Sequence, residues 1–456
     1  MSLSKFESML KTNSVYFFDS VEFEEIIQHY LDNGKHSLAK KAVRLGLEQH
    51  PTSVILKLLK VELLIFEDKL QNATALINEI ETVEPNNEDL LIHKATLQSK
   101  NNKHEAAIET LKHILTLTED KIDIWSMIGM EYLYLDDFEN ARLYFAYCID
   151  VDYEDYSSLY NVMYCFDMEN NHEEAVRFLN NYIDSNPYCE VAWHQLGRQF
   201  FVLNRFKEAL IAFDYAVLID EGFIGGYLEK AKTLEELQRY EEAIQNYLIT
   251  LELDDPTAFV FVRIGECYQQ LNDVQTAISY YKKAVHEDPL LDKGWLLLTN
   301  SYQQLEDYQK ALYYISKALQ TDESNPLYWR KYAEINLKLN LYQEVVKAFE
   351  QCLSLDDTSI EIYVGLADVL VFLGEYYEAL KILIKSKNYY KDFAEIEYRL
   401  CGLFMLTQKE DYSLLHLKNG LAIDAEYRMI VKELYPTVFE NEKVQVVINN
   451  YLKATE

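Results

Sequence analysis

The stretch EVAWHQLGRQFFVLNRFKEALIAFDYAVLIDEGF, residues 190–223, decides the fold. It holds two small residues, Gly197 in its first half and Ala209 in its second, where two antiparallel helices can approach closely. The large apolar residues expected to fill the space between this helix pair and the next are Trp193, Leu196, Phe200 and Phe213. Because one helix pair cannot bury its apolar face alone, the stretch predicts neighbouring pairs of the same kind.

The same pattern recurs along the chain at a step of 34 residues. Counted from Ala209, ten of the twelve positions in this register are alanine, and the other two are Val345 and Ser413. All four tryptophans share a second register: Trp125, Trp193, Trp295 and Trp329. A third register, where the second helix of a pair must stop, holds Pro51, Pro85, Pro187 and Pro289. The registers together predict twelve repeats, over residues 20–427, that start at 20, 54, 88, 122, 156, 190, 224, 258, 292, 326, 360 and 394.

The spacing of Trp193, Leu196, Gly197, Phe200, Ala209 and Phe213 resembles that of a tetratricopeptide repeat, with Phe200 in the place of the usual Tyr. The resemblance covers 408 of 456 residues. It implies an all-α fold, an α-solenoid in which antiparallel helix pairs form a right-handed superhelix. The first helices would line a concave groove and the second helices would form the outer face. The chain departs from the preferred aromatic or small residues at Lys57, Val61, Met163 and Glu397.

Both ends are expected to cap the solenoid, because a terminal repeat would otherwise expose its apolar side. Residues 1–19 would form an N-terminal capping helix and arm with Phe6, Met9, Leu10, Val15, Tyr16 and Phe17. Residues 428–456 would form C-terminal capping helices, broken at Pro436. Apolar residues on one face of the last helix are Val444, Val447, Ile448, Tyr451 and Leu452. The chain contains no Pro-, Gly- or Ser-rich linker, so one continuous repeat array is expected.

Composition narrows the function. The 43 Lys and Arg residues against 75 Asp and Glu residues give a net charge of −32. This charge argues against nucleic acid and anionic membrane as partners, and favours a solvated acidic outer face or, alternatively, a basic partner. Six cysteines without C-x-x-C spacing read as reduced thiols. The N-terminal residues lack the apolar run of a signal peptide, and no stretch is long and apolar enough to span a membrane. A cytoplasmic location is therefore expected.

No motif for catalysis or cofactor binding is present, so we expect no enzyme, no cofactor and no metal site. His93, His104 and His113 lie close in sequence, but they fall on different helices and a turn, which does not suit metal ligands. The residues outside the expected repeats, 48 in all, are too few for a catalytic domain or a helix-turn-helix module.

The family's fold implies that certain positions of each first helix face the groove. In repeats four to six, aromatic residues and methionines at these positions suggest an interface. This part of the candidate site consists of Met130, Tyr134, Tyr160, Asn161, Tyr164, His194, Arg198 and Phe201. Met127 and Met168 occupy equivalent positions. The alternative is that neighbouring helices cover these side chains.

Repeats seven to ten place mostly basic residues at the same positions: Lys232, Arg263, Lys293, Asn300, Arg330 and Lys331. Such a set suits an acidic segment, a phosphate or a chain-terminal carboxylate. The alternative, slightly favoured, is pairing within the helix, for example Lys232 with Glu236 or Arg330 with Glu334.

Repeat domains that bind the C-terminal carboxylate of cytosolic heat-shock chaperones use a fixed set of Lys, Asn and Arg residues. The nearest three repeats here carry His194, Arg198, Glu229, Phe259 and Arg263, which do not match. The sequence thus favours a non-enzymatic scaffold or adaptor that binds a protein or peptide in its concave groove. The alternative is an architectural subunit of a larger assembly, joined through its outer face and terminal helices. Self-association stays open.

Overall fold

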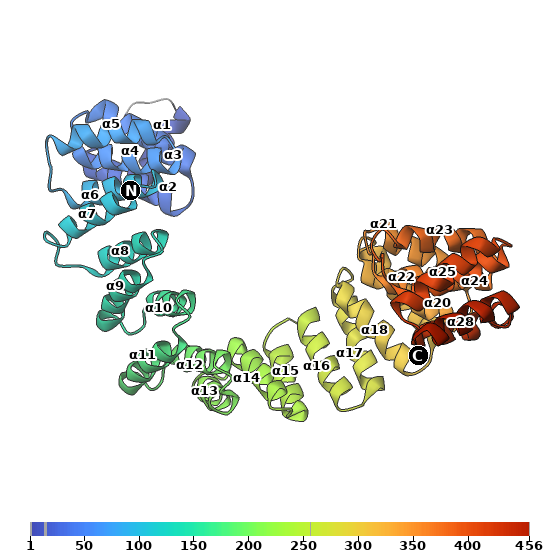
Figure 1. Ribbon diagram of the computed structural model, residues 1–456. Helices are drawn as coiled ribbons and strands as arrows, with labels where there is room; N and C mark the ends of the chain where they lie inside the picture. The colour runs from blue at the N-terminus through green and yellow to red at the C-terminus, as the bar shows by residue number, and fades with distance from the viewer. Residues whose placement is uncertain (1, 13–15, 256, 456) are drawn as a thin grey trace. The chain divides into compact units, whose positions relative to one another are not determined.

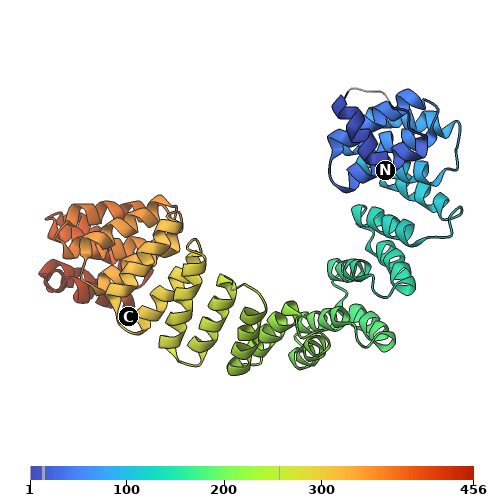
Figure 2. The same ribbon diagram turned by 180° about the vertical axis from the view of Figure 1, so that it is seen from behind.

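The computed structural model describes residues 2–12, 16–255 and 257–455. In this part of the chain every regular element is helical: 28 α-helices and one short 3-10 helix, with no strand. Contacts divide the chain into two compact units, residues 1–233 and 234–456, which are called here the N-terminal and the C-terminal unit. Within each unit, successive helices lie side by side as antiparallel pairs, as Figure 1 and the reverse view in Figure 2 show. The all-α solenoid expected from the sequence is confirmed.

The first helices of these pairs begin 34 residues apart: α2 (Ser20–Asp32), α4 (Val54–Phe66), α6 (Glu88–Lys100), α8 (Ile122–Tyr134), α10 (Tyr156–Met168), α12 (Glu190–Val202), α14 (Ile224–Glu236), α16 (Ala258–Gln270), α18 (Asp292–Gln304), α20 (Pro326–Lys338), α22 (Ile360–Phe372) and α24 (Ala394–Leu406). The second helices are α3 (His36–Gln49), α5 (Leu70–Glu81), α7 (His104–Ile114), α9 (Phe138–Val151), α11 (His172–Ser185), α13 (Phe206–Ile219), α15 (Tyr240–Leu253), α17 (Val274–Glu287), α19 (Tyr308–Thr321), α21 (Tyr342–Ser354), α23 (Tyr376–Ser386) and α25 (Glu410–Ile423). The boundary between the two units falls inside α14.

Several first helices start at a residue whose side chain caps the helix. The Asn87 side chain accepts a hydrogen bond from the backbone N–H of Leu90 at 3.0 Å, and Asp155 accepts one from Ser158 at 3.0 Å. Such a cap satisfies one of the N–H groups that the first turn of a helix leaves without a partner. These caps help to set where the helices begin.

The turn inside each helix pair has a left-handed residue at its centre. Twelve residues, again 34 apart, have φ between 53° and 81°: Gly34, Asp68, Asn102, Asp136, Asn170, Asn204, Gln238, Asn272, Glu306, Asn340, Gly374 and Gln408. Glycine adopts this conformation without strain, and Asn and Asp tolerate it better than other residues do. The turn therefore favours these residue types at this position, although Glu and Gln also occupy it.

The small residues lie where two helices approach closely, as the sequence predicts. All twelve residues in the register of Ala209 are fully buried, Val345 and Ser413 included. At Gly197, a Cβ atom would lie 2.5 Å from the ring of Phe213, and at Gly265 it would lie 2.4 Å from the ring of Tyr281. The two helices of each of these pairs are therefore as close as a glycine allows.

The tryptophan and proline registers are linked by hydrogen bonds. The indole N–H of Trp193 donates to the carbonyl of Pro187 at 2.9 Å, and that of Trp295 donates to Pro289 at 3.0 Å. Trp329 makes the same bond to the carbonyl of Glu323. Each bond ties a first helix to the turn that precedes it, and because the acceptor is a backbone carbonyl, Glu323 serves as well as a proline.

Further helices lie at both ends of the chain. In α1 (Ser2–Thr12), Phe6 and Met9 are buried, and Leu10 and Tyr16 pack against the same core, whereas Phe17 is exposed. Val15 lies outside the described residues.

The C-terminal end comprises a 3-10 helix (η1, Glu426–Arg428), α26 (Met429–Leu434), α27 (Pro436–Phe439) and α28 (Glu442–Thr455). Val444 and Ile448 of α28 are buried in the core of the C-terminal unit, with Val447, Tyr451 and Leu452 packed against it. A break in the helix stands at Pro436, as expected from the sequence.

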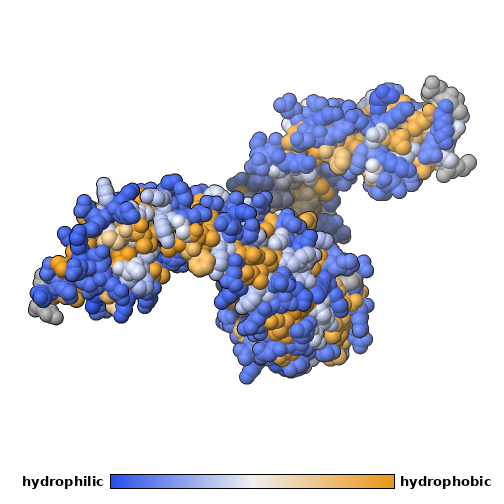
Figure 3. Space-filling view, turned by 90° about the vertical axis from the view of Figure 1, so that its right-hand side faces the viewer, coloured by the Kyte–Doolittle hydropathy of each residue, from blue (hydrophilic) through white to orange (hydrophobic). Residues whose placement is uncertain are grey.

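The surface is mostly polar. In Figure 3, hydrophilic residues cover most of the visible face and hydrophobic residues form patches between them. None of the helices in the described ranges combines the length and hydropathy needed to span a membrane. All six cysteines are buried and free, and burial raises the pKa of thiols such as Cys148, to about 11. They are therefore packing residues.

We predict that Gly197→Ala destabilises the protein by about 1–3 kcal/mol, because the added methyl group overlaps the Phe213 ring. Gly222→Ala is the matched control, since the nearest atom to its added Cβ is a carboxylate oxygen of Asp220 at 3.3 Å. Urea denaturation followed by circular dichroism measures both variants. Equal midpoints for the two variants would contradict the close approach at Gly197.

We also predict that Glu306→Gly stabilises the protein by about 1 kcal/mol, because it removes a side chain from a left-handed residue (φ 57°). The control is Glu350→Gly, the same substitution at an exposed site inside α21, which we expect to destabilise by a similar amount. The unfolding midpoint should rise in the first variant and fall in the second. A fall in both would show that the turn does not favour glycine.

Candidate functional site

Exposed aromatic residues and a methionine lie on α8 and α10 of the N-terminal unit. Tyr134 is 59% exposed, Tyr160 44%, Tyr164 49% and Met168 48%. The last three are spaced four residues apart along α10, so they share one face of that helix. We call these four side chains the tyrosine surface. Neighbouring helices do not cover it, which was the alternative explanation of its composition.

Two ring contacts hold members of this surface in place. Tyr134 stacks on the imidazole of His104 in α7, with ring centroids 5.1 Å apart. The ring of Tyr164 contacts Phe138 of α9 edge-to-face at 6.4 Å. Tyr134 and Tyr164 thus each rest on a residue of another helix, while about half of each side chain stays accessible. Such partly supported rings lose little entropy on binding.

The other predicted residues of repeats four to six are less accessible. Met130 and Phe201 are half-buried and pack against the core of this region, and Asn161 is half-buried. His194 packs against the rings of Phe213 and Phe223, and both its ring nitrogens are buried without a hydrogen-bond partner. Burial, followed by the charge of Arg198, lowers the pKa of His194 to about 4, so the ring is neutral at physiological pH.

Arg198 itself is exposed, and its guanidinium donates to Gln195 at 3.3 Å. It is therefore an accessible cation on the next first helix, α12.

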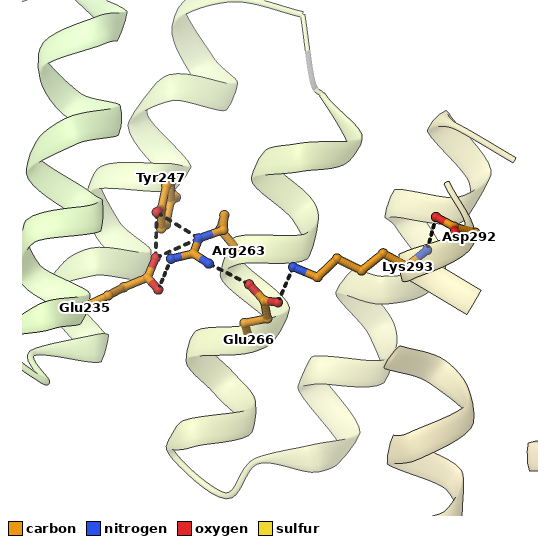
Figure 4. Close-up of polar contacts among 6 residues, drawn as sticks. All are labelled: Glu235, Tyr247, Arg263, Glu266, Asp292 and Lys293. Atoms are coloured by element: carbon orange, nitrogen blue, oxygen red, sulfur yellow. Dashed lines mark hydrogen bonds and ion pairs between the residues drawn. The ribbon is translucent and has the colours of Figure 1, made fainter. Parts of the chain in front are cut away.

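In the C-terminal unit, Arg263 of α16 lies at the centre of a polar network (Figure 4). Its guanidinium donates to both carboxylate oxygens of Glu235 and to Glu266, and Tyr247 donates to Glu235 at 2.6 Å. Burial disfavours the charge on Arg263, but the bond with Tyr247 and the nearby carboxylates together raise its pKa. Arg263 is thus a charged group whose hydrogen bonds are already used within the protein.

The network continues to the next first helix. Lys293 of α18 makes an ion pair with Glu266 at 2.8 Å, as Figure 4 shows. A pocket of about 510 Å³ adjoins Arg263, and its walls contain Glu235, Glu236 and Glu266 but only one cation. The predicted basic set is therefore not a positively charged surface here, because the carboxylates around it equal or exceed the cations.

The remaining predicted basic residues are also paired. Arg330 makes two parallel hydrogen bonds to Asp357 and a third to Ser359, so the predicted pairing with Glu334 is wrong. Glu334 instead pairs with Lys331 at 3.1 Å, and Lys232 pairs with Glu229 at 2.7 Å. Arg330 lowers the pKa of Asp357.

Asn300 is exposed on α18. Of the predicted site, the tyrosine surface, Arg198, Lys293 and Asn300 are accessible, although Lys293, like most of the other basic side chains, is paired with a carboxylate. Distant carboxylates such as Asp357, 27 residues from Arg330, carry no sequence signal that identifies their partner.

No metal centre is evident among the described residues, where no three His, Cys, Asp or Glu side chains are grouped to hold an ion. The histidines considered from the sequence have different environments. His104 bonds to the buried carboxylate of Glu131 at 2.8 Å, and burial lowers the pKa of His93.

Family models for the tetratricopeptide repeat match residues 122–155 and 228–291. The first of these ranges begins at the first residue of α8. Over 90 residues the chain is 31% identical to the Hsp70-Hsp90 organising protein of Plasmodium falciparum, a match that covers 20% of this chain and 35% of that protein. A second protein of the same name, from P. falciparum isolate 3D7, matches at 31% over 90 residues and 16% of its length. The chain thus spans about a third or less of the length of these relatives.

Among solved structures, the C-terminal part of a TPR repeat-containing protein from Cytophaga hutchinsonii is 15% identical, with 56% of this chain and 99% of that chain covered and a TM-score of 0.43. The Cut9 and Hcn1 assembly of APC/C is 13% identical to this chain. The match covers 99% of this chain and 92% of that chain, with a TM-score of 0.34. YrrB, described as a TPR protein with an unusual peptide-binding site, is 13% identical to this chain. The match covers 39% of this chain and 91% of that chain, with a TM-score of 0.34.

Antiparallel helix pairs at a constant step define this chain as a helical repeat protein. The two family-model matches and the register of small residues identify the repeat. The chain thus contains tetratricopeptide repeats.

The Arg263 network yields a prediction about stability. Arg263→Ala leaves Glu235, whose side chain is only 13% exposed, without its cation, and should cost about 2 kcal/mol or more. Arg177→Ala is the control, because the Arg177–Glu174 pair is solvent-exposed and should contribute less than about 0.5 kcal/mol. Chemical denaturation measures both. A cost for Arg263→Ala as small as that of the control would mean that the network adds little to the fold.

Proposed function

We propose that this protein is a non-enzymatic scaffold that binds a protein or peptide segment on the inner side of its helix array. The observation that carries the proposal is the tyrosine surface, where three tyrosines and a methionine are 44–59% exposed at positions that core packing does not require. Aromatic residues and methionine are the side chains that contribute most to protein interfaces. Arg198, exposed on α12, would add a charge-assisted bond to the bound segment.

The relatives support binding as the general role, since one is named an organising protein of Hsp70 and Hsp90. The residues that would hold a chaperone carboxylate do not occur here in that pattern, because Glu229 and Phe259 stand at two of the positions concerned. We therefore propose a different partner for this chain. The six free thiols favour a reducing compartment such as the cytoplasm.

A second candidate role, as an architectural subunit, is favoured by exposed apolar residues on the outer helix α13. Ile211 is 55% exposed, Tyr215 45% and Leu218 73%, and they lie on one side of this helix. Tyr215 stacks on Trp193 with ring centroids 4.5 Å apart, which holds the ring in place. A permanent neighbour in an assembly would cover such a surface.

One experiment separates the two roles. The double variant Tyr160→Ala, Tyr164→Ala should weaken binding of the captured partner at least about tenfold, since each ring at the centre of an interface contributes 1 kcal/mol or more. The matched control is Tyr313→Ala with Tyr377→Ala, two exposed tyrosines on the second helices α19 and α23. Arg198→Glu should also weaken binding.

Partners are identified by affinity capture and mass spectrometry, and their affinities are then measured with purified proteins. Equal affinity of the Tyr160/Tyr164 variant, the Tyr313/Tyr377 variant and the unmodified chain would exclude the tyrosine surface. Loss of partners with Ile211→Ser and Leu218→Ser, but not with the tyrosine variants, would favour the architectural role.

A further inference from the structure

A pocket lies between α3 and α4, which belong to the first two helix pairs of the N-terminal unit. Its volume is about 690 Å³, within the range of sites that bind small ligands or side chains. The α3 wall contains Ser37, Lys40, Lys41, Val43, Arg44, Leu47 and Glu48, and the α4 wall contains Lys60, Leu63, Leu64 and Glu67. On each helix these residues are mostly three or four apart, so each wall is one continuous helix face. We call this pocket the basic channel.

The floor of the basic channel is apolar. Val43 and Leu63 are 3% and 5% exposed, and they belong to the core that α2, α3 and α4 share. Leu47 and Leu64 are partly buried and extend this floor along both helices. An apolar side chain placed here would contact four aliphatic residues and displace water from them.

The rim of the channel is cationic. Lys40 pairs with Glu67 at 2.7 Å, Lys69 also pairs with Glu67 at 2.6 Å, and Arg44 lies 3.7 Å from Glu48. Hydrogen bonds from Lys40 and Lys69 lower the pKa of Glu67 to about 2. Both carboxylates of the rim are therefore matched by nearby cations.

Two further cations remain on the rim, one on each wall. Among the described residues, neither Lys41 of α3 nor Lys60 of α4 pairs with a carboxylate. The surrounding segment, residues 35–69, has seven Lys and Arg against four Asp and Glu, whereas the whole chain carries −32. The channel is thus a local positive region on a strongly negative protein.

We propose that the basic channel binds a short acidic peptide segment of a partner protein, with an apolar side chain on the floor and carboxylates at Lys41 and Lys60. Charge complementarity selects an acidic occupant, and the apolar floor selects one with a hydrophobic anchor. A nucleic acid suits the channel poorly, because its backbone needs a long run of cations and has no aliphatic group for the floor.

The test uses the full chain and a short fluorescein-labelled peptide of Glu and Leu residues, measured by fluorescence anisotropy. Two matched probes replace each Glu by Lys, or each Leu by Ser. We expect the Glu–Leu peptide to bind more tightly than either probe, and its affinity to fall as salt rises, since salt screens exposed charges over about 8 Å at physiological strength.

Lys41→Glu with Lys60→Glu should weaken binding of the Glu–Leu peptide at least about tenfold. Lys41→Arg with Lys60→Arg should retain it. The control with the same change of net charge is Lys385→Glu with Lys432→Glu, two exposed lysines of the C-terminal unit, which should leave binding unchanged.

Three results would overturn the proposal. Equal binding of the peptide by the Lys41/Lys60 and the Lys385/Lys432 variants would show that the peptide binds at another site on the chain. Equal binding of the Glu–Ser peptide would show attraction by charge without use of the floor. A dimer in sedimentation velocity that Lys41→Glu with Lys60→Glu dissociates would identify a second copy as the occupant. Circular dichroism and thermal unfolding establish that each variant is folded.

Discussion

The contact between a small residue on one helix and a large ring on the next sets the geometry of the helix pairs. Gly197 accepts the ring of Phe213, and Gly265 accepts that of Tyr281, at distances that leave no room for a Cβ atom. Where the first helix carries the larger Met163 at the equivalent position, the residue sixteen positions later is Leu179 rather than an aromatic, and α10 packs more extensively against α9 than against its own partner α11. A larger residue on the first helix is thus accompanied by a smaller residue on the second, because a closely packed contact has room for a fixed total volume. Every other feature of the array, from the turns to the exposed faces, depends on this spacing.

Much of this fold could be predicted from the sequence because the packing pattern is periodic and local. Small residues, tryptophans and prolines at a common step indicate the helix pairs, and the buried state of Ala209 and its equivalents follows from that step. The turns also carry a signal of their own, because the left-handed residue in each turn is often Asn, Asp or Gly, as Asn204 illustrates. The departures are explained by partners that no local pattern reveals. Glu397, buried where an aromatic residue is preferred, accepts hydrogen bonds from Lys387, His416 and Asn419.

The candidate site was harder to predict, for a physical reason. Position along a helix shows which side chains leave the core, but it does not show which charges meet across helices. The sequence leaves Arg263 and Lys293 as cations that are free or paired within their own helices. In the structure Arg263 pairs with Glu266 of its own helix and also with Glu235 of α14, and Lys293 pairs with Glu266 of the preceding first helix. In a chain with 75 acidic residues, many cations, such as Arg330, find a carboxylate within reach. Aromatic residues are not subject to this compensation, because only burial removes them from the surface, so the exposure of Tyr160 follows more directly from its position.

For the binding of a partner, the charges close to the site matter more than the net charge of the chain. A net charge of −32 suggests repulsion of any acidic partner, but electrostatic forces between exposed groups weaken within about 8–10 Å at physiological ionic strength. A site is therefore governed by the charges on its own rim. At the basic channel, the two rim carboxylates are already matched, and Lys41 and Lys60 add positive charge beside an apolar floor. At Arg263 the balance is reversed, with three carboxylates around one guanidinium. The basic channel and the surroundings of Arg263 thus have opposite local charge although both belong to one acidic chain.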